Sequence, residues 1–232
     1  DMLGAAHIAA ALSGVAPSTP TIVGVYQGSY GDSTDASSYT VTAAAIGTAA
    51  ADRSVKLAFS SGASANITVS GVTIGGVTAT PVVTEAATGI RILEIWEASV
   101  PIGTTADIVV TFSGTANRFA AHWWTTTGGS SPTYLARASE NTEFNGSTST
   151  MTTTAMTVPT GGFAIAVARL GSSSAPVIVW GQTTGSGTTH ADAIPGAEAL
   201  RMGAYDSDTT GSQQFTATGF ATQFRIAAAA WR

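Results

Sequence analysis

The sequence predicts an all-β protein, an antiparallel β-sandwich of the jelly-roll kind, and three observations support this prediction. Charged residues make up only 10% of the chain, and Gly, Thr, Ser and Ala are abundant, as suits pleated strands joined by short turns. Val- and Thr-rich runs alternate apolar and polar side chains with a period of two. Glycine-containing turns separate these runs about every eight to twelve residues, which is typical of a sandwich or barrel.

The N-terminal segment, residues 1–19, is the one stretch that predicts a helix. Residues 2–12 are rich in Ala, and Pro17 and Pro20 would end such a helix. The segment is either a loosely docked terminus or an anchor that buries its apolar side chains in a neighbouring subunit. As an anchor it would make its assembly contacts through Met2, Leu3, Ile8 and Leu12. It lacks the basic start of a signal peptide, and no apolar run approaches the roughly 18–20 residues of a membrane helix, so we expect no membrane insertion.

The clearest strand lies within residues 53–62. Val55, Leu57 and Phe59 would point to one face of a sheet, and the residues between them would point to the other. Residues 106–113 alternate in the same manner. The sequence therefore predicts strands at both places.

An internal repeat of about 110 residues relates the two halves of the chain. Five segments pair in order: 38–47 with 149–158, 53–62 with 162–171, 65–72 with 175–182, 90–99 with 199–208, and 116–124 with 222–231. Residue identity is low, but the order and spacing of five apolar strands agree. We predict two sandwich repeats, 20–128 and 129–232, either in tandem or fused into one pseudo-symmetric sandwich. The alternative is a chance agreement among similar Thr- and Ala-rich strands.

Composition also narrows the range of functions. The net charge is −5 and the arginines are scattered singly, so no basic cluster predicts binding to nucleic acid. The chain has no Cys, which excludes disulfides, thiolate metal sites and a Cys nucleophile. We expect no cofactor.

Motifs for catalysis are missing from the sequence. There is no G-x-S-x-G elbow, and His7, His122 and His190 have no metal-binding spacing. We expect His122, beside two tryptophans, to be a half-buried structural residue. Glu94 and Glu97 resemble the carboxylate pair of a glycosidase, but residues three apart on a strand face opposite sides of a sheet. We therefore interpret them as solvated charges on an outer face or edge, and we expect the protein not to be an enzyme.

Residues 206–211 copy the first half of a calcium-binding loop. Asp206 and Asp208 stand at the first and third positions and Gly211 at the sixth, but Ala217 stands where the motif requires a bidentate Glu. A polar hairpin turn is the favoured interpretation, and the two aspartates are only weak candidates for metal ligands.

Aromatic side chains are the candidates for ligand binding, because sugars stack on exposed aromatic faces. Trp123 and Trp124 are adjacent, so on one strand they face opposite sides, and at least one should lie near solvent or another subunit. The alternative is that each tryptophan fills the core or covers a sheet end. The candidates for a ligand-binding surface are Trp124, Trp180 and Tyr205.

Four runs carry a resemblance to a known family: IGTAAADRSVKLAF (46–59), VTIGGVTAT (72–80), EIWEASVPIGTTADIVVTFSGTANR (94–118) and IAAAAWR (226–232). With these runs the chain resembles structural proteins of tailed bacteriophages and phage-like gene-transfer particles, such as head-spike, tail-fibre and minor virion proteins. The likeness covers residues 20–232. It rests on the succession of strand-like and turn-like segments more than on any chemical motif. It implies a jelly-roll-like sandwich, assembly in several copies and exposure on a particle that meets a bacterial surface.

From the resemblance we expect the protein to have a structural role in a particle. We expect a capsid-decorating, spike or fibre component located on the virion surface, with other virion proteins as partners, a homo-oligomeric state such as a trimer, and contact with a host-surface glycan. The alternative is a secreted carbohydrate-binding module or adhesin repeat, which would use the same sandwich as a free or cell-attached domain.

Overall fold

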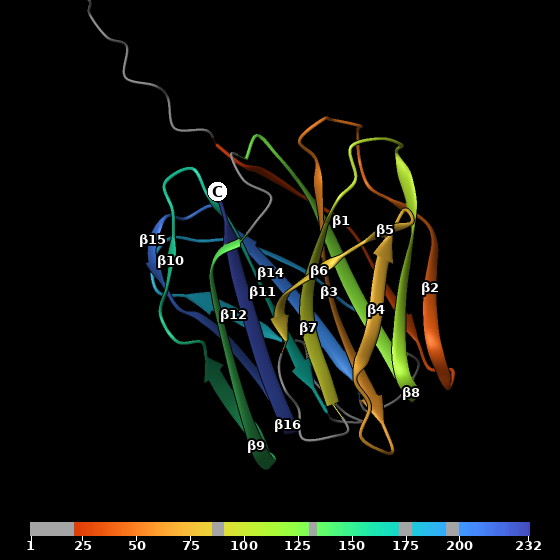
Figure 1. Ribbon diagram of the computed structural model, residues 1–232. Coiled ribbons are helices and arrows are strands. Elements are labelled where there is room, and N and C mark those ends of the chain that lie inside the picture. The colour runs from red at the N-terminus through yellow and green to blue at the C-terminus, as the bar shows by residue number, and fades with distance from the viewer. Residues whose placement is uncertain (1–20, 85–90, 130–133, 172–177, 194–199) are drawn as a thin grey trace, which may run out of the picture.

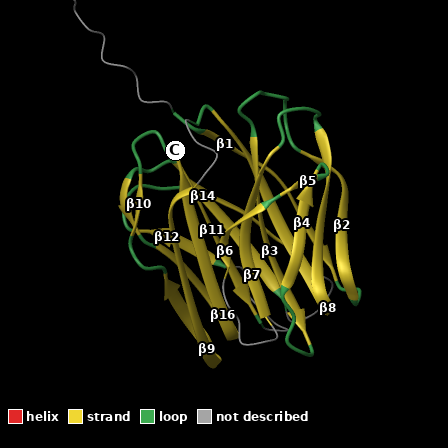
Figure 2. Ribbon diagram, in the orientation of Figure 1, coloured by secondary structure: helices red, strands yellow, loops and turns green. Residues whose placement is uncertain are grey.

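The computed structural model describes residues 21–84, 91–129, 134–171, 178–193 and 200–232. In this part of the chain the structure consists of strands and loops, without a helix, and every strand pairing is antiparallel (Figure 2). The all-β, sheet-on-sheet prediction is therefore confirmed. The predicted N-terminal anchor, with Met2, Leu3, Ile8 and Leu12, lies outside the described residues.

The first sheet contains eight strands, all from the N-terminal half of the chain. They are β1 (Val23–Asp32), β2 (Ala36–Ala45), β3 (Ser54–Ala63), β4 (Val69–Ile74), β5 (Val77–Thr78), β6 (Thr80–Thr84), β7 (Arg91–Ser99) and β8 (Thr105–Thr127). Their order is β5-β4-β8-β3-β7-β6. The long strand β8 also pairs along its other edge, with β2 through its first half and with β1 through its second half.

The second sheet comes from the C-terminal half. Its strands are β9 (Tyr134–Thr152), β11 (Phe163–Leu170), β12 (Val179–Gln182), β13 (Thr188–Ala193), β14 (Arg201–Ser207) and β16 (Phe215–Trp231). The order is β12-β16-β11-β14-β13, with β9 along the other edge of β16. Two short strands, β10 (Met156–Val158) and β15 (Gly211–Gln213), form a separate ladder.

The two strand orders correspond element by element. The series β4-β8-β3-β7-β6 matches β12-β16-β11-β14-β13, and β9 takes the place that β1 and β2 share beside β8. In both sheets the last strand is long and ends at or just past a tryptophan. The duplication and the domain limits 20–128 and 129–232 stay predictions, since a shared topology does not establish a common origin.

The two sheets pack face to face (Figure 1), and the buried side chains of one apolar cluster lie between them. This inter-sheet layer takes Leu93, Ile95 and Ala120 from the first sheet and Ile165 and Ala227 from the second. Each sheet carries a further apolar cluster on its other face. The cluster of the first sheet collects residues from both halves of β8, so that sheet wraps around its own core.

Alternation along the strands explains this three-layer core. Val55, Leu57 and Phe59 of β3 all face the cluster within the first sheet, as predicted, while Ala58 faces the inter-sheet layer. In β16 the run 227–230 is entirely alanine, and its members alternate between the inter-sheet layer and the outer cluster. Such small side chains let a strand be covered on both faces at close range.

Glu94 and Glu97 require a correction. They do lie on opposite faces of β7, but neither is solvated, because each is only 8% exposed. Trp96 donates to Glu94 at 2.6 Å. Glu97 faces the second sheet, where it accepts hydrogen bonds from Lys56 of β3 at 2.6 Å and from Trp231 of β16 at 2.7 Å. The face predicted to be open to water is covered by the second sheet.

Candidate functional site

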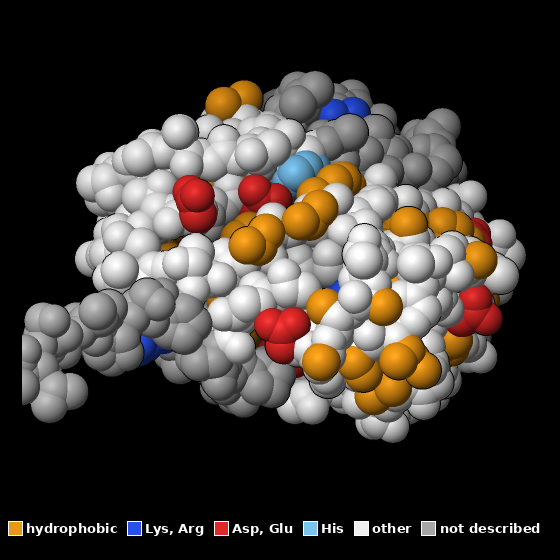
Figure 3. Space-filling view, turned by 90° about the horizontal axis from the view of Figure 1, so that it is seen from above, with side chains coloured by type: hydrophobic (Ala, Val, Ile, Leu, Met, Phe, Trp, Pro, Cys, Tyr) orange, Lys and Arg blue, Asp and Glu red, His pale blue; other side chains and the backbone are white. Residues whose placement is uncertain are grey.

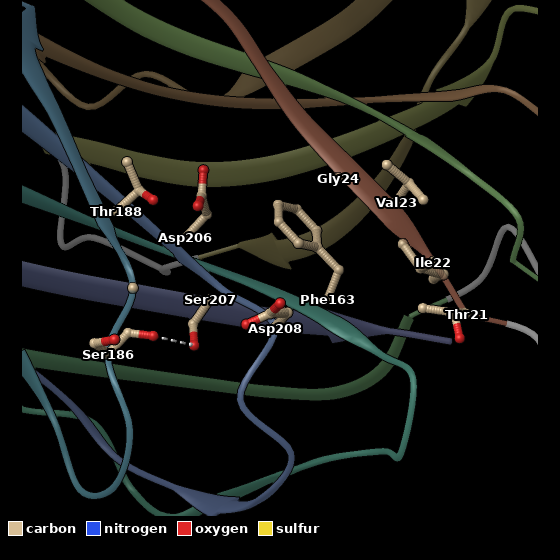
Figure 4. Close-up of a pocket in the computed structure, with 11 residues that line it drawn as sticks. Thr21, Ile22, Val23, Gly24, Phe163, Ser186, Thr188, Asp206, Ser207 and Asp208 are labelled. Atoms are coloured by element: carbon tan, nitrogen blue, oxygen red, sulfur yellow. Dashed lines mark hydrogen bonds between the residues drawn. The ribbon is translucent and has the colours of Figure 1, made fainter.

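A pocket of about 440 Å³ opens at one end of the inter-sheet layer (Figure 4). Residues 21–24 at the start of β1 form one wall, and residues 186–188 and 206–208 form the other. The ring of Phe163, at the start of β11, lies between these walls. The pocket thus combines an apolar floor with walls that carry hydroxyl and carboxylate groups.

Gly24 is required where β1 passes over the pocket floor. A Cβ atom at this position would overlap the ring of Phe163, which is itself buried in the inter-sheet layer. The glycine therefore lets β1 approach the second sheet closely.

We expect Gly24→Ala to lower the free energy of unfolding by about 1–3 kcal/mol, because the added methyl group overpacks a buried ring. Gly71→Ala is the matched control, since a Cβ atom there meets nothing within 4 Å. Urea unfolding of the two variants measures the difference. Equal effects of the two substitutions would contradict the close approach of β1 to Phe163.

A hydrogen-bonded cluster of aromatic and acidic side chains adjoins the pocket. The Asp206 carboxylate accepts from Trp124 Nε1 at 2.8 Å and pairs with His190 Nε2 at 2.5 Å through the same oxygen, Oδ2. Tyr26 stacks on the His190 ring with centroids 3.8 Å apart. These contacts join β1, β8, β13 and β14. The cluster fixes the carboxylate of Asp206 at the pocket wall.

His122 supports this cluster from inside the layer. Its Nε2 lies 3.0 Å from the carbonyl oxygen of Met202, which can only accept, so Nε2 carries the proton. Its Nδ1 is then the acceptor for the hydroxyl of Tyr26, at 3.0 Å. Burial lowers the pKa of His122 to about 4, so the ring is neutral near pH 7. The prediction of a structural histidine agrees with this position, although the residue is fully buried and not half-buried.

Two of the three aromatic ligand candidates, Trp124 and Tyr205, are buried. Trp123 and Trp124 face opposite sides, as predicted, but they are 5% and 0% exposed, so the expectation that one lies near solvent is wrong. Each finds a hydrogen-bond acceptor inside, Trp123 at the carbonyl of Ala45 and Trp124 at Asp206. Trp124 therefore offers no face on which a sugar could stack.

The other two aromatic candidates lie elsewhere in the second sheet. Tyr205 is buried, and Trp180 is half-buried and stacks on it at 5.7 Å between centroids. They belong to the outer cluster of the second sheet, on the opposite face from the pocket-lining residue Asp206. The structure does not bring them together with Trp124.

The two aspartates proposed as weak metal candidates both line the pocket. Asp206 Oδ2 is already engaged by Trp124 and His190, whereas Asp208 is exposed. Within the described ranges there is no group of three or more His, Asp or Glu side chains that could hold a metal ion.

Sequence reasoning missed the partnership of Tyr26, His190 and Asp206, and it also missed Phe163. His190 and Asp206 lie on neighbouring antiparallel strands, β13 and β14, which the spacing of a hairpin could have suggested. No local signal places Tyr26 on His190, because that contact depends on how the two sheets pack.

Comparison of the chain with protein-family models, with curated proteins and with solved structures finds no match. The fold and site therefore define the chain only as an all-β protein of antiparallel, face-to-face sheets with a polar pocket at one end. Among the residues described, no helix has the length and apolar character needed to cross a membrane.

Proposed function

We propose that the protein is a structural component of a virion or phage-like particle, displayed on the particle surface, and that its pocket binds a host-surface glycan. The particle role rests on the resemblance to phage structural proteins and on a surface that carries few charges. Figure 3 shows such a surface on the end of the molecule seen from above: most of it is uncharged, and acidic side chains appear at scattered places, one of them beside a histidine.

The observation that carries the glycan role is the lining of the pocket. The hydroxyls of Ser186 and Thr188 and the exposed carboxylate of Asp208 line the pocket together with the ring of Phe163. A sugar ring presents hydroxyls at its rim and C–H groups on its face, and this lining complements both. The volume of about 440 Å³ falls within the range of roughly 300–1,000 Å³ common for small-ligand sites.

The charge of the pocket defines the class of glycan. Two carboxylates line it and none of the lining residues is basic. A neutral or amino sugar is therefore favoured over a sialylated, sulfated or phosphorylated one, since like charges repel. Several copies of a weak site on one particle would bind firmly by avidity.

The pocket supports binding better than catalysis. The nitrogen of His190 nearest the site is paired with Asp206, and His122 is neutral and enclosed. Among the described residues, the hydrogen-bond partners of the two histidines are Tyr26, the carbonyl of Met202 and Asp206, and not a serine or threonine hydroxyl of the pocket wall. We therefore propose a non-enzymatic role.

Glycan binding is tested with Asp208→Ala in a glycan array followed by titration calorimetry. A hydrogen bond to a charged group contributes about 1.5–3 kcal/mol, so we expect the affinity for a neutral glycan to fall about ten- to a hundredfold. Asp35→Ala is the matched control, because Asp35 is an equally exposed acid outside the pocket lining. Equal binding by the two variants would contradict the assignment of the site, and release of sugar from the glycan would contradict the non-enzymatic role.

The location is tested separately, by immunogold electron microscopy of particles and by the solution mass of the full chain. Labelled particles and a homo-oligomer support the virion role. A monomer that binds a defined polysaccharide and does not label particles supports the alternative, a secreted carbohydrate-binding module. The pocket is complete within one chain, as that alternative requires.

A further inference from the structure

Four arginines converge at the end of the inter-sheet layer opposite the pocket. Arg91 of β7 and Arg118 of β8 both pair in register with Gly62 of β3, one on each side. In the second sheet Arg169 of β11 pairs directly with Arg225 of β16. Alternation along each strand turns all four toward the layer between the sheets. Half of the chain's eight arginines thus meet at one place.

Arg169 spans the gap between the two sheets at this end. Its Nη2 atom lies 3.7 Å from the position that a Cβ atom of Gly62 would occupy. The residue is only 4% exposed, and its Nε and Nη1 atoms are buried without a hydrogen-bond partner among the described residues. Burial, and then the positive charges of Arg91, Arg225 and Arg118, lower the pKa of Arg169 to about 9.

A second buried arginine of the same chain shows how such a group is ordinarily accommodated. Arg53 is 1% exposed, and its guanidinium donates to the carbonyl oxygens of Val100, Ile46, Gly47 and Ile102 at 2.7–3.1 Å. Every nitrogen of Arg53 has an acceptor. Arg169 is buried almost as deeply but has no such ring of carbonyls, and it stands among like charges.

A buried guanidinium is stable only where its donors are bonded and its charge is balanced. We propose that the end of the inter-sheet layer around Arg169 is a binding site for a small oxyanion, such as a sulfate, phosphate or carboxylate group. The anion accepts hydrogen bonds from the unpaired Nε and Nη1 donors of Arg169 and balances the charge of this guanidinium. This site is separate from the glycan pocket and does not depend on the proposed function.

The four arginines differ in how far they are exposed. Arg91 and Arg118 are half-buried, whereas Arg169 and Arg225 are 4% and 3% exposed. The exposure of the arginines therefore falls from the first sheet to the second at this end of the layer. The arginine end is a feature of both sheets, so an anion there links them.

The test measures the thermal unfolding of the full chain in increasing sodium sulfate, with sodium chloride adjusted to hold the ionic strength constant. We expect the Tm of the wild-type protein to rise and saturate, by roughly 5–10 °C once sulfate exceeds its Kd about a hundredfold. Sulfate also stabilises proteins without binding, but that effect does not saturate. Inorganic phosphate serves as a second probe.

Arg169→Met separates an anion site from a structural arginine. Without sulfate the variant should be at least as stable as the wild type, because an uncompensated buried charge is removed, and it should lack the saturable rise. Arg201→Met is the matched control, since Arg201 lies beside Leu170 on the neighbouring strand and faces the other side of the sheet. It should respond to sulfate as the wild type does.

The same saturable rise in Arg169→Met, or none in the wild type, would overturn the proposal. So would an equal loss of stability in Arg169→Met at every sulfate concentration, because the charge would then be balanced within the chain. If that variant does not fold, wild-type crystals soaked in selenate decide the matter by anomalous diffraction. A selenium peak within hydrogen-bond distance of Arg169 supports the site, and the absence of a peak there rejects it.

Discussion

Replacement of Glu97 by alanine is expected to lower the free energy of unfolding by about 3–5 kcal/mol. Glu97 Oε2 accepts from both Lys56 Nζ, at 2.6 Å, and Trp231 Nε1, at 2.7 Å. Lys56 is fully buried, and its ammonium also lies 4.8 Å from the centroid of the Trp231 ring. Removing the carboxylate takes away the charge that balances this ammonium and the acceptor of the indole N–H. Urea unfolding of the variant measures the loss.

Two controls distinguish charge balance from simple packing. Glu97→Gln keeps an oxygen acceptor for Trp231 but loses the charge, so it should still be strongly destabilised. The double variant Lys56→Met with Glu97→Leu replaces the pair by apolar side chains of similar size and should recover most of the lost stability. A loss below about 1 kcal/mol in Glu97→Ala would show that the pair is weak, as solvated ion pairs are.

This ion pair illustrates what the sequence could predict and what it could not. The alternation along β3 correctly placed Val55, Leu57 and Phe59 on one face. It also placed Lys56 on the other face, but the alternation within one strand does not show which element covers that face. Lys56 and Glu97 are direct cross-strand neighbours, a register that requires the pairing of β3 with β7 across 41 positions of sequence.

A usable signal for the second layer was present in the alanine run 227–230. Four consecutive small apolar residues on a strand leave no polar face for solvent, so the strand has to be covered on both sides. The same reasoning applied to Trp123 and Trp124 would have favoured two covered faces over an exposed tryptophan. The prediction failed because it assumed that a sandwich strand has one face in water.

The sequence predicted less of the candidate site than of the fold. Asp206 and Asp208 were singled out for a calcium motif, and they lie at the pocket for a different reason, namely that β14 ends there. Their neighbours Tyr26 and Phe163 come from the other sheet and from a distant strand. The position of Tyr26 depends on how the two sheets pack, and that of Phe163 on the pairing of β11 with β14, and no local pattern encodes either.

The second large effect is the dependence of the free energy of unfolding on pH. It arises from two buried groups whose pKa values shift in opposite directions. Burial raises the pKa of Glu94 from its ordinary 4.5 to about 7, although the hydrogen bond from Trp96 opposes the shift. Between these values the folded state holds a proton that the unfolded state has lost. The stability that Glu94 contributes is therefore fully present below pH 4.5 and is lost as the pH rises through about 7. At 1.36 kcal/mol for each pKa unit, the change is about 3 kcal/mol.

His122 acts in the other direction over nearly the same range. Its pKa falls from 6.5 to about 4 on burial, so between these values the unfolded state binds more protons than the folded state. Its contribution is present above pH 6.5 and is lost as the pH falls through about 4, again by about 3 kcal/mol. Between pH 4.5 and 6.5 the two slopes oppose each other, and their sum in the wild-type protein is small.

Single substitutions should make each of the two slopes of unfolding free energy against pH measurable by itself. Glu94→Gln removes the acid, so its stability should rise by about 3 kcal/mol from pH 4 to 6.5, whereas His122→Gln should become less stable from pH 4.5 to 7 by a similar amount. The two residues lie on opposite faces of the first sheet and share no partner, so their effects should add. The double variant should then vary little with pH, which urea unfolding at pH 4, 5.5 and 7 measures. Parallel pH profiles in the two single variants would contradict both assignments, because the sign of each slope follows from which state holds the proton.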